Sequence, residues 1–309
     1  MADYPEPFVV QPRALPHKQT FILLHGRGSS GEKFGSVLLD TPISCPRGSS
    51  VLDNSQKSTL TSIFPHARFI FPSAARRRAT VYKRALTHQW FDNWKLDPPA
   101  TDREDLQVSG LQETTSYLHR ILEREIALVP GGAKSVVFGG LSQGCAASLT
   151  ALLLWEGDAF CAAVGMCGWL PFAARMGEQI GEMSCQLQGE DGGEDVFDPF
   201  ARDHLDDDAT TQTDPASRAL SWLRDEIQVP PTQNGNELKF RDVPLFLGHG
   251  VQDDRVDVVL GQEASRCLTT LGMSVSWNEY GDLGHWYSET LLQDMVDFLR
   301  SHLPVDFNS

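Results

Sequence analysis

Short apolar runs alternate with longer amphipathic segments along most of the chain. Apolar runs that favour strands lie at residues 20–24, 67–71, 136–138, 160–166 and 243–247, and residues 274–280 alternate as a further strand. Helical spacing and capping residues predict helices from near Gly31 and Cys145 and over 111–128, 258–271 and 289–303. Strands that alternate with helices imply right-handed crossovers. The order therefore predicts an α/β fold, with a mostly parallel central sheet flanked by helices and with surface insertions.

Three stretches interrupt this alternation. Residues 41–62 are polar and irregular and are predicted to be a surface insertion, and residues 72–94 lack periodicity and are predicted to be a long loop. Residues 186–214 are acidic, rich in glycine and almost free of aliphatic side chains, so they cannot bury enough apolar area to offset their ordering entropy. A flexible excursion is favoured, and a lid over the active-site edge is the alternative. We predict a single domain over 1–309, with insertions at about 41–62 and 186–241.

The composition narrows the class of protein. Of the 309 residues, 41% are hydrophobic and 9% aromatic, as in globular enzymes. The formal charge of −15 argues against a nucleic-acid partner, because phosphates need stripes of Lys and Arg. The six cysteines form no C-x-x-C pair and no metal-ligand spacing, so we predict neither a metal site nor a disulfide framework. Without a signal-peptide pattern or an apolar stretch of about 18 residues, we predict no transmembrane segment and a cytoplasmic location.

One serine lies in a motif that is typical of a nucleophile. The sequence Gly140-Leu141-Ser142-Gln143-Gly144 follows a predicted strand and precedes a predicted helix. That is the setting of the G-x-S-x-G elbow, in which a sharp turn lifts the serine hydroxyl out of the sheet. A glycine-rich turn with an incidental serine is the alternative, because a short motif also occurs by chance. Ser142 therefore needs partners.

Acid and base candidates follow two later strands. Asp253 and Asp254 come after the run at 243–247, and His285 comes after the strand at 274–280. The carboxyl ends of parallel strands meet at one edge of a sheet, and the order serine, acid, histidine is that of α/β-hydrolases. His285 would take the proton of Ser142 during attack, and the aspartate would fix the imidazole tautomer.

An oxyanion hole needs two further donors. We expect one to be the backbone N–H of Gln143, directly after the nucleophile, and the other the N–H of Arg27 in the early loop 25–28. His25 and His249 are interpreted as structural residues.

Five motifs occur in the order of a known family. They are LLHGRGSSG, the PSA loop that ends in QWFD, GGLSQG, LGHGVQDDRV and YGDLGHW, and they span roughly residues 20–300. The chain resembles the acyl-protein thioesterase and phospholipase/carboxylesterase family of α/β-hydrolases. The family pattern H-G-x-x-D-x-x-V selects Asp253 over Asp254, although the family's usual D-P-x-V-P is replaced here by residues 253–257, DDRVD. The resemblance implies a cofactor-independent serine hydrolase that cleaves carboxylic esters or thioesters through an acyl-enzyme on Ser142.

Two features bear on the substrate, which we expect to be an ester or thioester with an acyl chain or an anionic group. Arg77 and Arg78 belong to a basic cluster in the loop 72–94, which is either a solvated surface or an anchor for a carboxylate or phosphate. Trp90 and Phe91 either wall an acyl pocket or belong to the core. Acyl transfer by the same acyl-enzyme is an alternative activity, and a non-catalytic ligand-binding protein is an alternative of another class.

Overall fold

The computed structural model describes residues 2–43, 58–186, 214–230 and 238–303. Its centre is a seven-stranded sheet with the strand order β1-β3-β2-β6-β7-β8-β9. The strands are β1 (Phe8–Val10), β2 (Gln19–Leu24), β3 (Ala67–Phe71), β6 (Val136–Leu141), β7 (Ala162–Met166), β8 (Leu245–Gly250) and β9 (Val275–Tyr280). All neighbours pair in parallel except β1, which is antiparallel to β3. The predicted parallel α/β sheet is confirmed.

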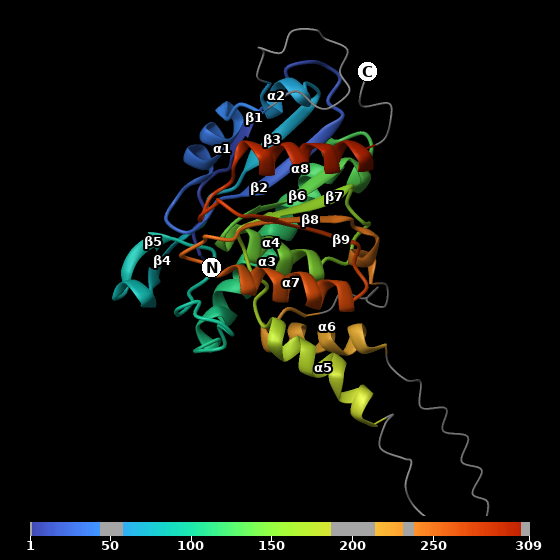
Figure 1. The fold of residues 1–309 in the computed structure, drawn as a ribbon. Coiled ribbons are helices and arrows are strands. Elements are labelled where there is room, and N and C mark those ends of the chain that lie inside the picture. Colours follow the sequence, from blue (N-terminus) through green and yellow to red (C-terminus); the bar gives the residue numbers. More distant parts are fainter. Residues whose placement is uncertain (1, 44–57, 187–213, 231–237, 304–309) are drawn as a thin grey trace, which may run out of the picture.

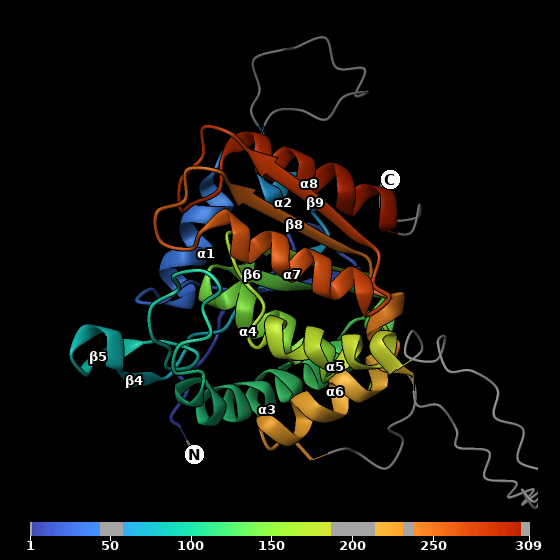
Figure 2. The ribbon, with the colours of Figure 1, turned by 60° about the horizontal axis from the view of Figure 1, so that its bottom comes forward.

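Helices cover both faces of this sheet (Figure 1). On one face lie α1 (Gly31–Asp40), the short α2 (Leu60–Ile63) and α8 (Glu289–His302), and on the other lie α3 (Asp105–Leu128), α4 (Gln143–Leu153) and α7 (Val258–Thr270). Figure 2 shows α5 (Ala173–Gln186) and α6 (Pro215–Glu226) outside this second layer.

Two hydrophobic cores result from the alternation of side chains along the central strands. In β2, Phe21 and Leu23 join the core that contains residues of α1 and α8, and the two residues Ile22 and Leu24 join the core that contains residues of α3 and α4. Successive side chains of a strand point to opposite faces, so a strand that is covered on both sides must be apolar throughout. This explains why the predicted strands are continuous apolar runs.

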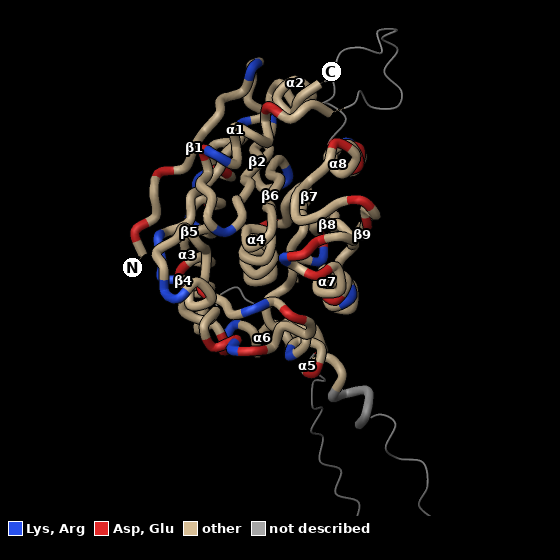
Figure 3. The backbone as a smooth tube through the Cα atoms, turned by 60° about the vertical axis from the view of Figure 1, so that its left-hand side comes forward, with Lys and Arg blue, Asp and Glu red and all other residues tan. Residues whose placement is uncertain are grey.

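The stretch 72–94 contains a β-hairpin, so the prediction of an irregular loop is wrong. β4 (Arg76–Ala79) pairs antiparallel with β5 (Ala85–His88), and the 3-10 helix η1 (Thr80–Tyr82) connects them. The hairpin was missed because its basic residues, which Figure 3 shows as a blue cluster, leave no alternation of apolar and polar positions.

Part of the predicted insertion 186–241 belongs to the folded body. Its acidic residues 187–213 and also 231–237 lie outside the described residues, as do residues 44–57 of the predicted insertion 41–62. Between them, α6 begins at Pro215, and the Asp214 side chain caps it by accepting a hydrogen bond from the amide of Ser217 (3.3 Å). Leu220 and Leu223 of α6 are buried in the core. None of the helices in the described ranges is long and apolar enough to cross a membrane.

Candidate active site

The chain turns sharply at Ser142, between β6 and α4. Ser142 has φ 56° and ψ −124°, a strained conformation for a residue other than glycine. It directly follows the last residue of β6, at the edge of the sheet. The neighbouring glycines allow the turn, because a Cβ atom on Gly144 would lie 2.5 Å from the carbonyl oxygen of Leu24 and one on Gly140 would lie 2.7 Å from the same oxygen. The predicted G-x-S-x-G geometry is therefore present.

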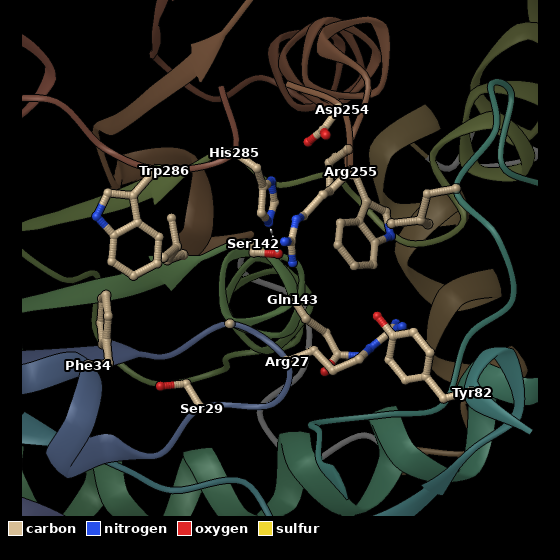
Figure 4. A pocket seen from close by; sticks show the side chains of 15 residues that line it. Arg27, Ser29, Phe34, Tyr82, Ser142, Gln143, Asp254, Arg255, His285 and Trp286 are labelled. Carbon is tan, nitrogen blue, oxygen red and sulfur yellow. Dashed lines mark hydrogen bonds between the residues drawn. The ribbon is translucent and has the colours of Figure 1, made fainter. Parts of the chain in front are cut away.

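The structure brings Ser142, His285 and Asp253 together (Figure 4 shows the first two). His285 Nδ1 lies 2.9 Å from Asp253 Oδ1 and 2.8 Å from Oδ2, and Nε2 lies 2.9 Å from Ser142 Oγ. A carboxylate only accepts hydrogen bonds, so Nδ1–H donates to Asp253, and in this tautomer Nε2 is placed to accept from the serine hydroxyl. This is the arrangement that a general base requires.

The Asp253 carboxylate is buried and well supplied with donors. Its Oδ1 accepts hydrogen bonds from the amides of Arg255 and Val256, each at 2.9 Å, and His249 Nε2 lies 3.3 Å from Oδ2. Burial by itself would raise the pKa of Asp253, but the hydrogen bonds from His249, His285 and the two amides outweigh it and hold the pKa below its usual range. Asp253 is therefore ionised at neutral pH.

Asp254 lies differently from its neighbour. It is exposed at the rim of the pocket, and its side chain makes no hydrogen bond within the described part of the chain. The histidine thus contacts Asp253, which is the residue that the family pattern indicates.

Two residues that line the pocket beside Ser142 have free backbone amides. The N–H groups of Arg27 and Gln143 have no acceptor among the described residues, and both residues line the same pocket as Ser142. A Cβ atom on Gly26 would lie 3.2 Å from the Cβ atom of Ser142, so the early loop passes directly over the nucleophile.

The Gln143 side chain has a structural role that the sequence analysis did not predict. Its Oε1 accepts from the amide of Trp90 (3.0 Å), and its Nε2 donates to the carbonyl of Phe91 (2.7 Å) and to Asn93 Oδ1 (3.1 Å). A buried amide needs hydrogen-bond partners, and the burial of Gln143 becomes known only from the structure. Gln143 thereby fixes the loop after β5 to the nucleophile turn.

His25 and His249, which lie near the site, are each held by hydrogen bonds to the backbone. His25 Nε2 accepts from the amide of Ala74 (3.0 Å) and its Nδ1–H donates to the carbonyl of Gly26 (2.7 Å), and burial lowers its pKa to about 4. His249 Nε2–H donates to the carbonyl of Val256 (2.9 Å). Neither imidazole contacts the Ser142 hydroxyl.

A pocket of about 510 Å³ opens over Ser142 and His285 (Figure 4). Its apolar and aromatic lining residues are Phe34, Tyr82, Leu96, Leu141, Trp169, Val256 and Trp286. Of the two interpretations of Trp90 and Phe91, the structure shows the core and not a wall of this pocket. Both are fully buried, Trp90 Nε1 donates to the carbonyl of His25 (2.8 Å), and Phe91 packs edge-on against Trp169. Their position in the sequence beside the site did not reveal that their side chains point inward.

Of the two interpretations of the basic cluster, the structure does not support an anion anchor formed by Arg77 and Arg78 at this pocket. Arg77 pairs with Glu113 of α3 (2.7 Å), and Arg78 donates to the carbonyl of Arg84 within the hairpin (3.3 Å). Neither arginine lines the pocket, since one guanidinium group contacts α3 and the other contacts the backbone of the hairpin. The arginines that do line it are Arg27 and Arg255.

A serine that contacts a neutral imidazole, a carboxylate behind it and two free amides, all at the carboxyl edge of a parallel sheet, define the class of serine α/β-hydrolases. The chain belongs to the phospholipase/carboxylesterase family, whose model matches residues 48–191 and 216–303. Acyl-protein thioesterase 1 of Gibberella zeae is 24% identical over 300 residues, which cover 96% of this chain and 95% of that protein.

Further comparisons agree with this assignment. Carboxylesterase SOBER1 of Arabidopsis thaliana is 28% identical over 242 residues, which cover 78% of this chain and 88% of that protein. The crystal structure of acyl-protein thioesterase 2 from Zea mays has the same fold, with a TM-score of 0.62 at 21% identity over 97% of this chain and 100% of that chain.

Proposed function

We propose that the protein hydrolyses carboxylic esters or thioesters through an acyl-enzyme on Ser142, with His285 as general base and acid and Asp253 as its partner. The single observation that carries these roles is the unbroken series of contacts from Ser142 Oγ through His285 to Asp253, at 2.9 Å and 2.8 Å. The relatives are named as acyl-protein thioesterases and a carboxylesterase, which supports this choice of reaction.

Each step follows from the donors and acceptors of these residues. His285 Nε2 takes the hydroxyl proton as Ser142 attacks the carbonyl carbon, and the imidazolium is stabilised by the Asp253 charge. The amides of Arg27 and Gln143 donate to the oxygen that becomes negative, and the imidazolium then gives its proton to the leaving alcohol or thiol. Water, activated by the same imidazole, releases the acid from the acyl-enzyme.

The Ser142→Ala variant tests the proposal. It removes the nucleophile without adding volume, so kcat for p-nitrophenyl butyrate should fall by at least about 10³-fold while the circular dichroism spectrum stays unchanged. Ser148→Ala is a matched control on the same helix, because the Ser148 hydroxyl donates to the carbonyl of Cys145 (2.8 Å) and does not line the pocket. Its activity should stay within about threefold of wild type.

A fluorophosphonate probe gives an independent measurement. It should label the wild-type protein and the Ser148→Ala variant but not Ser142→Ala. Full turnover by Ser142→Ala would reject the nucleophile, and a folded wild-type protein that neither turns over esters nor reacts with the probe would indicate a binding protein instead. Product analysis with an added alcohol or amine distinguishes hydrolysis from acyl transfer.

A cytoplasmic location and a single domain remain predictions.

A further inference from the structure

Two positive charges line the pocket of a strongly acidic protein. The chain has a formal charge of −15, yet Arg27 and Arg255 are lining residues of the pocket, and among the described residues Asp254 is the one carboxylate that lines it. The Asp254 side chain is exposed at the rim. A neutral ester or thioester needs neither cation for binding.

Arg27 lacks the carboxylate partner that other partly buried arginines of the described chain have. Within the described residues, the partly buried Arg68, Arg77 and Arg224 pair with carboxylates at 3.0, 2.7 and 2.7 Å. Arg27 makes no ion pair with the described part of the chain, its buried Nε has no hydrogen-bond partner, and its guanidinium carbon lies 5.6 Å from the centre of the Tyr82 ring. Burial lowers the pKa of Arg27, and the contact with Tyr82 and the charge of Asp92 offset only part of this electrostatic penalty.

Arg255 approaches the pocket from the opposite wall. Its amide donates to Asp253 Oδ1 (2.9 Å), which fixes its backbone next to the triad. In Figure 4 its side chain runs beside His285 toward Ser142, while Arg27 extends toward Tyr82. No carboxylate in the described ranges pairs with the Arg255 guanidinium. The pocket thus presents guanidinium groups from two loops that flank the nucleophile, and neither group forms an ion pair with a carboxylate of the described residues.

We propose that the preferred substrate carries a carboxylate or phosphate group near the scissile ester or thioester bond, and that the side chains of Arg27 and Arg255 bind it. This inference rests on the proposed hydrolase function and adds the substrate class. A guanidinium donates paired hydrogen bonds to the oxygens of either anion, and such charge-assisted bonds are stronger where water is partly excluded. The apolar lining residues remain available for the rest of the substrate.

Paired substrates measure this preference. On the acyl side, p-nitrophenyl glutarate has a carboxylate where p-nitrophenyl valerate has a methyl group. On the alcohol side, 1-butyrylglycerol 3-phosphate has a phosphate that 1-butyrylglycerol lacks. In at least one pair, kcat/KM should favour the anionic substrate by about 10- to 100-fold, the range expected for hydrogen bonds to a charged group. The pair that responds identifies the side of the bond on which the anion lies.

The same ratio measured in variants assigns the preference to the arginines. Arg27→Gln should lower it by about tenfold or more, Arg27→Lys should retain part of it, and Arg255→Gln should lower it less because that side chain is more exposed. Arg78→Gln is the matched control, since Arg78 lies in the hairpin outside the pocket and its loss should leave the ratio unchanged.

The outcomes separate this inference from the proposed function. A ratio near one in both substrate pairs, or a ratio that Arg27→Gln and Arg255→Gln leave intact, would overturn the anionic substrate while Ser142-dependent hydrolysis of the valerate ester stands. Hydrolysis of the valerate ester that survives in Ser142→Ala would instead reject the proposed function. Equal loss of both substrates of a pair in Arg27→Gln would show that Arg27 acts on the reaction and not on the choice of substrate.

Discussion

Replacement of Asp253 by asparagine removes the charge of the triad acid while keeping its shape. The Asp253 Oδ1 atom accepts hydrogen bonds from the amides of Arg255 and Val256, at 2.9 Å each, so the asparagine carbonyl oxygen must occupy that position. The new NH2 group then takes the place of Oδ2, 2.8 Å from His285 Nδ1. An NH2 group only donates, so this contact favours an imidazole that accepts at Nδ1 and carries its proton on Nε2. The carbonyl oxygen in the Oδ1 position, 2.9 Å from Nδ1, is already shared between two amides and competes weakly for the Nδ1 proton.

In this tautomer the histidine no longer acts as a base. Nε2–H would donate to Ser142 Oγ, 2.9 Å away, instead of accepting its proton. His249 Nε2–H, which lies 3.3 Å from Oδ2 in the wild type, would face the same NH2 group and add a repulsive contact. The corresponding change in a Ser-His-Asp protease lowers kcat about 10⁴-fold with the geometry intact. We expect kcat to fall by about 10³- to 10⁴-fold, or about 4–5.5 kcal/mol of activation free energy.

The neighbouring aspartate supplies the control. Asp254→Asn removes the same charge from an exposed side chain that makes no hydrogen bond within the described chain, so kcat should change by less than about tenfold. Steady-state hydrolysis of p-nitrophenyl butyrate at neutral pH measures both variants, and thermal melts establish that both are folded. An Asp253→Asn variant within about tenfold of wild type, or a larger loss in Asp254→Asn, would refute this reasoning.

Two further predictions concern stability. Gly144→Ala places a Cβ atom 2.5 Å from the Leu24 carbonyl oxygen and should lower the free energy of unfolding by about 1–3 kcal/mol. Gly177→Ala in α5, where nothing lies within 4 Å of the new Cβ atom, should raise it by about 0.5–1 kcal/mol. Urea titrations that give both variants the same stability would contradict this. His25 has its pKa lowered to about 4, so below its unfolded pKa the unfolded chain binds a proton that the folded chain does not, and stability falls as the pH decreases. Between about pH 7 and 4.5, the free energy of unfolding of the wild type should therefore fall by about 2 kcal/mol more than that of His25→Gln. The glutamine keeps an acceptor for the Ala74 amide. Equal losses in both proteins would argue against this.

The sheet and the triad were predictable from the sequence for one shared reason. A strand covered on both faces is apolar along its whole length, and the polar residues that end β8 and β9 must then emerge at the same edge. Asp253 and His285 follow those strands, so their order and type predicted that they lie near Ser142, whereas the choice of Asp253 over Asp254 came from the family pattern. The glycines of the turn likewise follow from the lack of space beside Leu24.

The pocket lining was not predictable, because it depends on which way side chains point in segments without periodicity. Trp90 and Phe91 lie next to the site in the sequence but are buried beneath it, and Arg77 and Arg78 point away from it toward α3 and the hairpin. Arg27 was singled out only for its amide. Its unpaired guanidinium becomes visible only when the surroundings of the side chain are known.

The buried residues of the QWFD motif connect the substrate pocket with the oxyanion loop. Trp90 Nε1 donates to the carbonyl of His25, its amide donates to the Gln143 side chain, and His25 Nε2 accepts from the amide of Ala74. The two segments that supply the free amides of Arg27 and Gln143 are thus hydrogen-bonded through one buried tryptophan. Donors that are already held in place need no reorganisation when charge develops on the substrate oxygen. Trp90 therefore holds the segments that carry the proposed oxyanion hole, and the proposed substrate contacts belong to residues of the pocket loops, Arg27 and Arg255 among them.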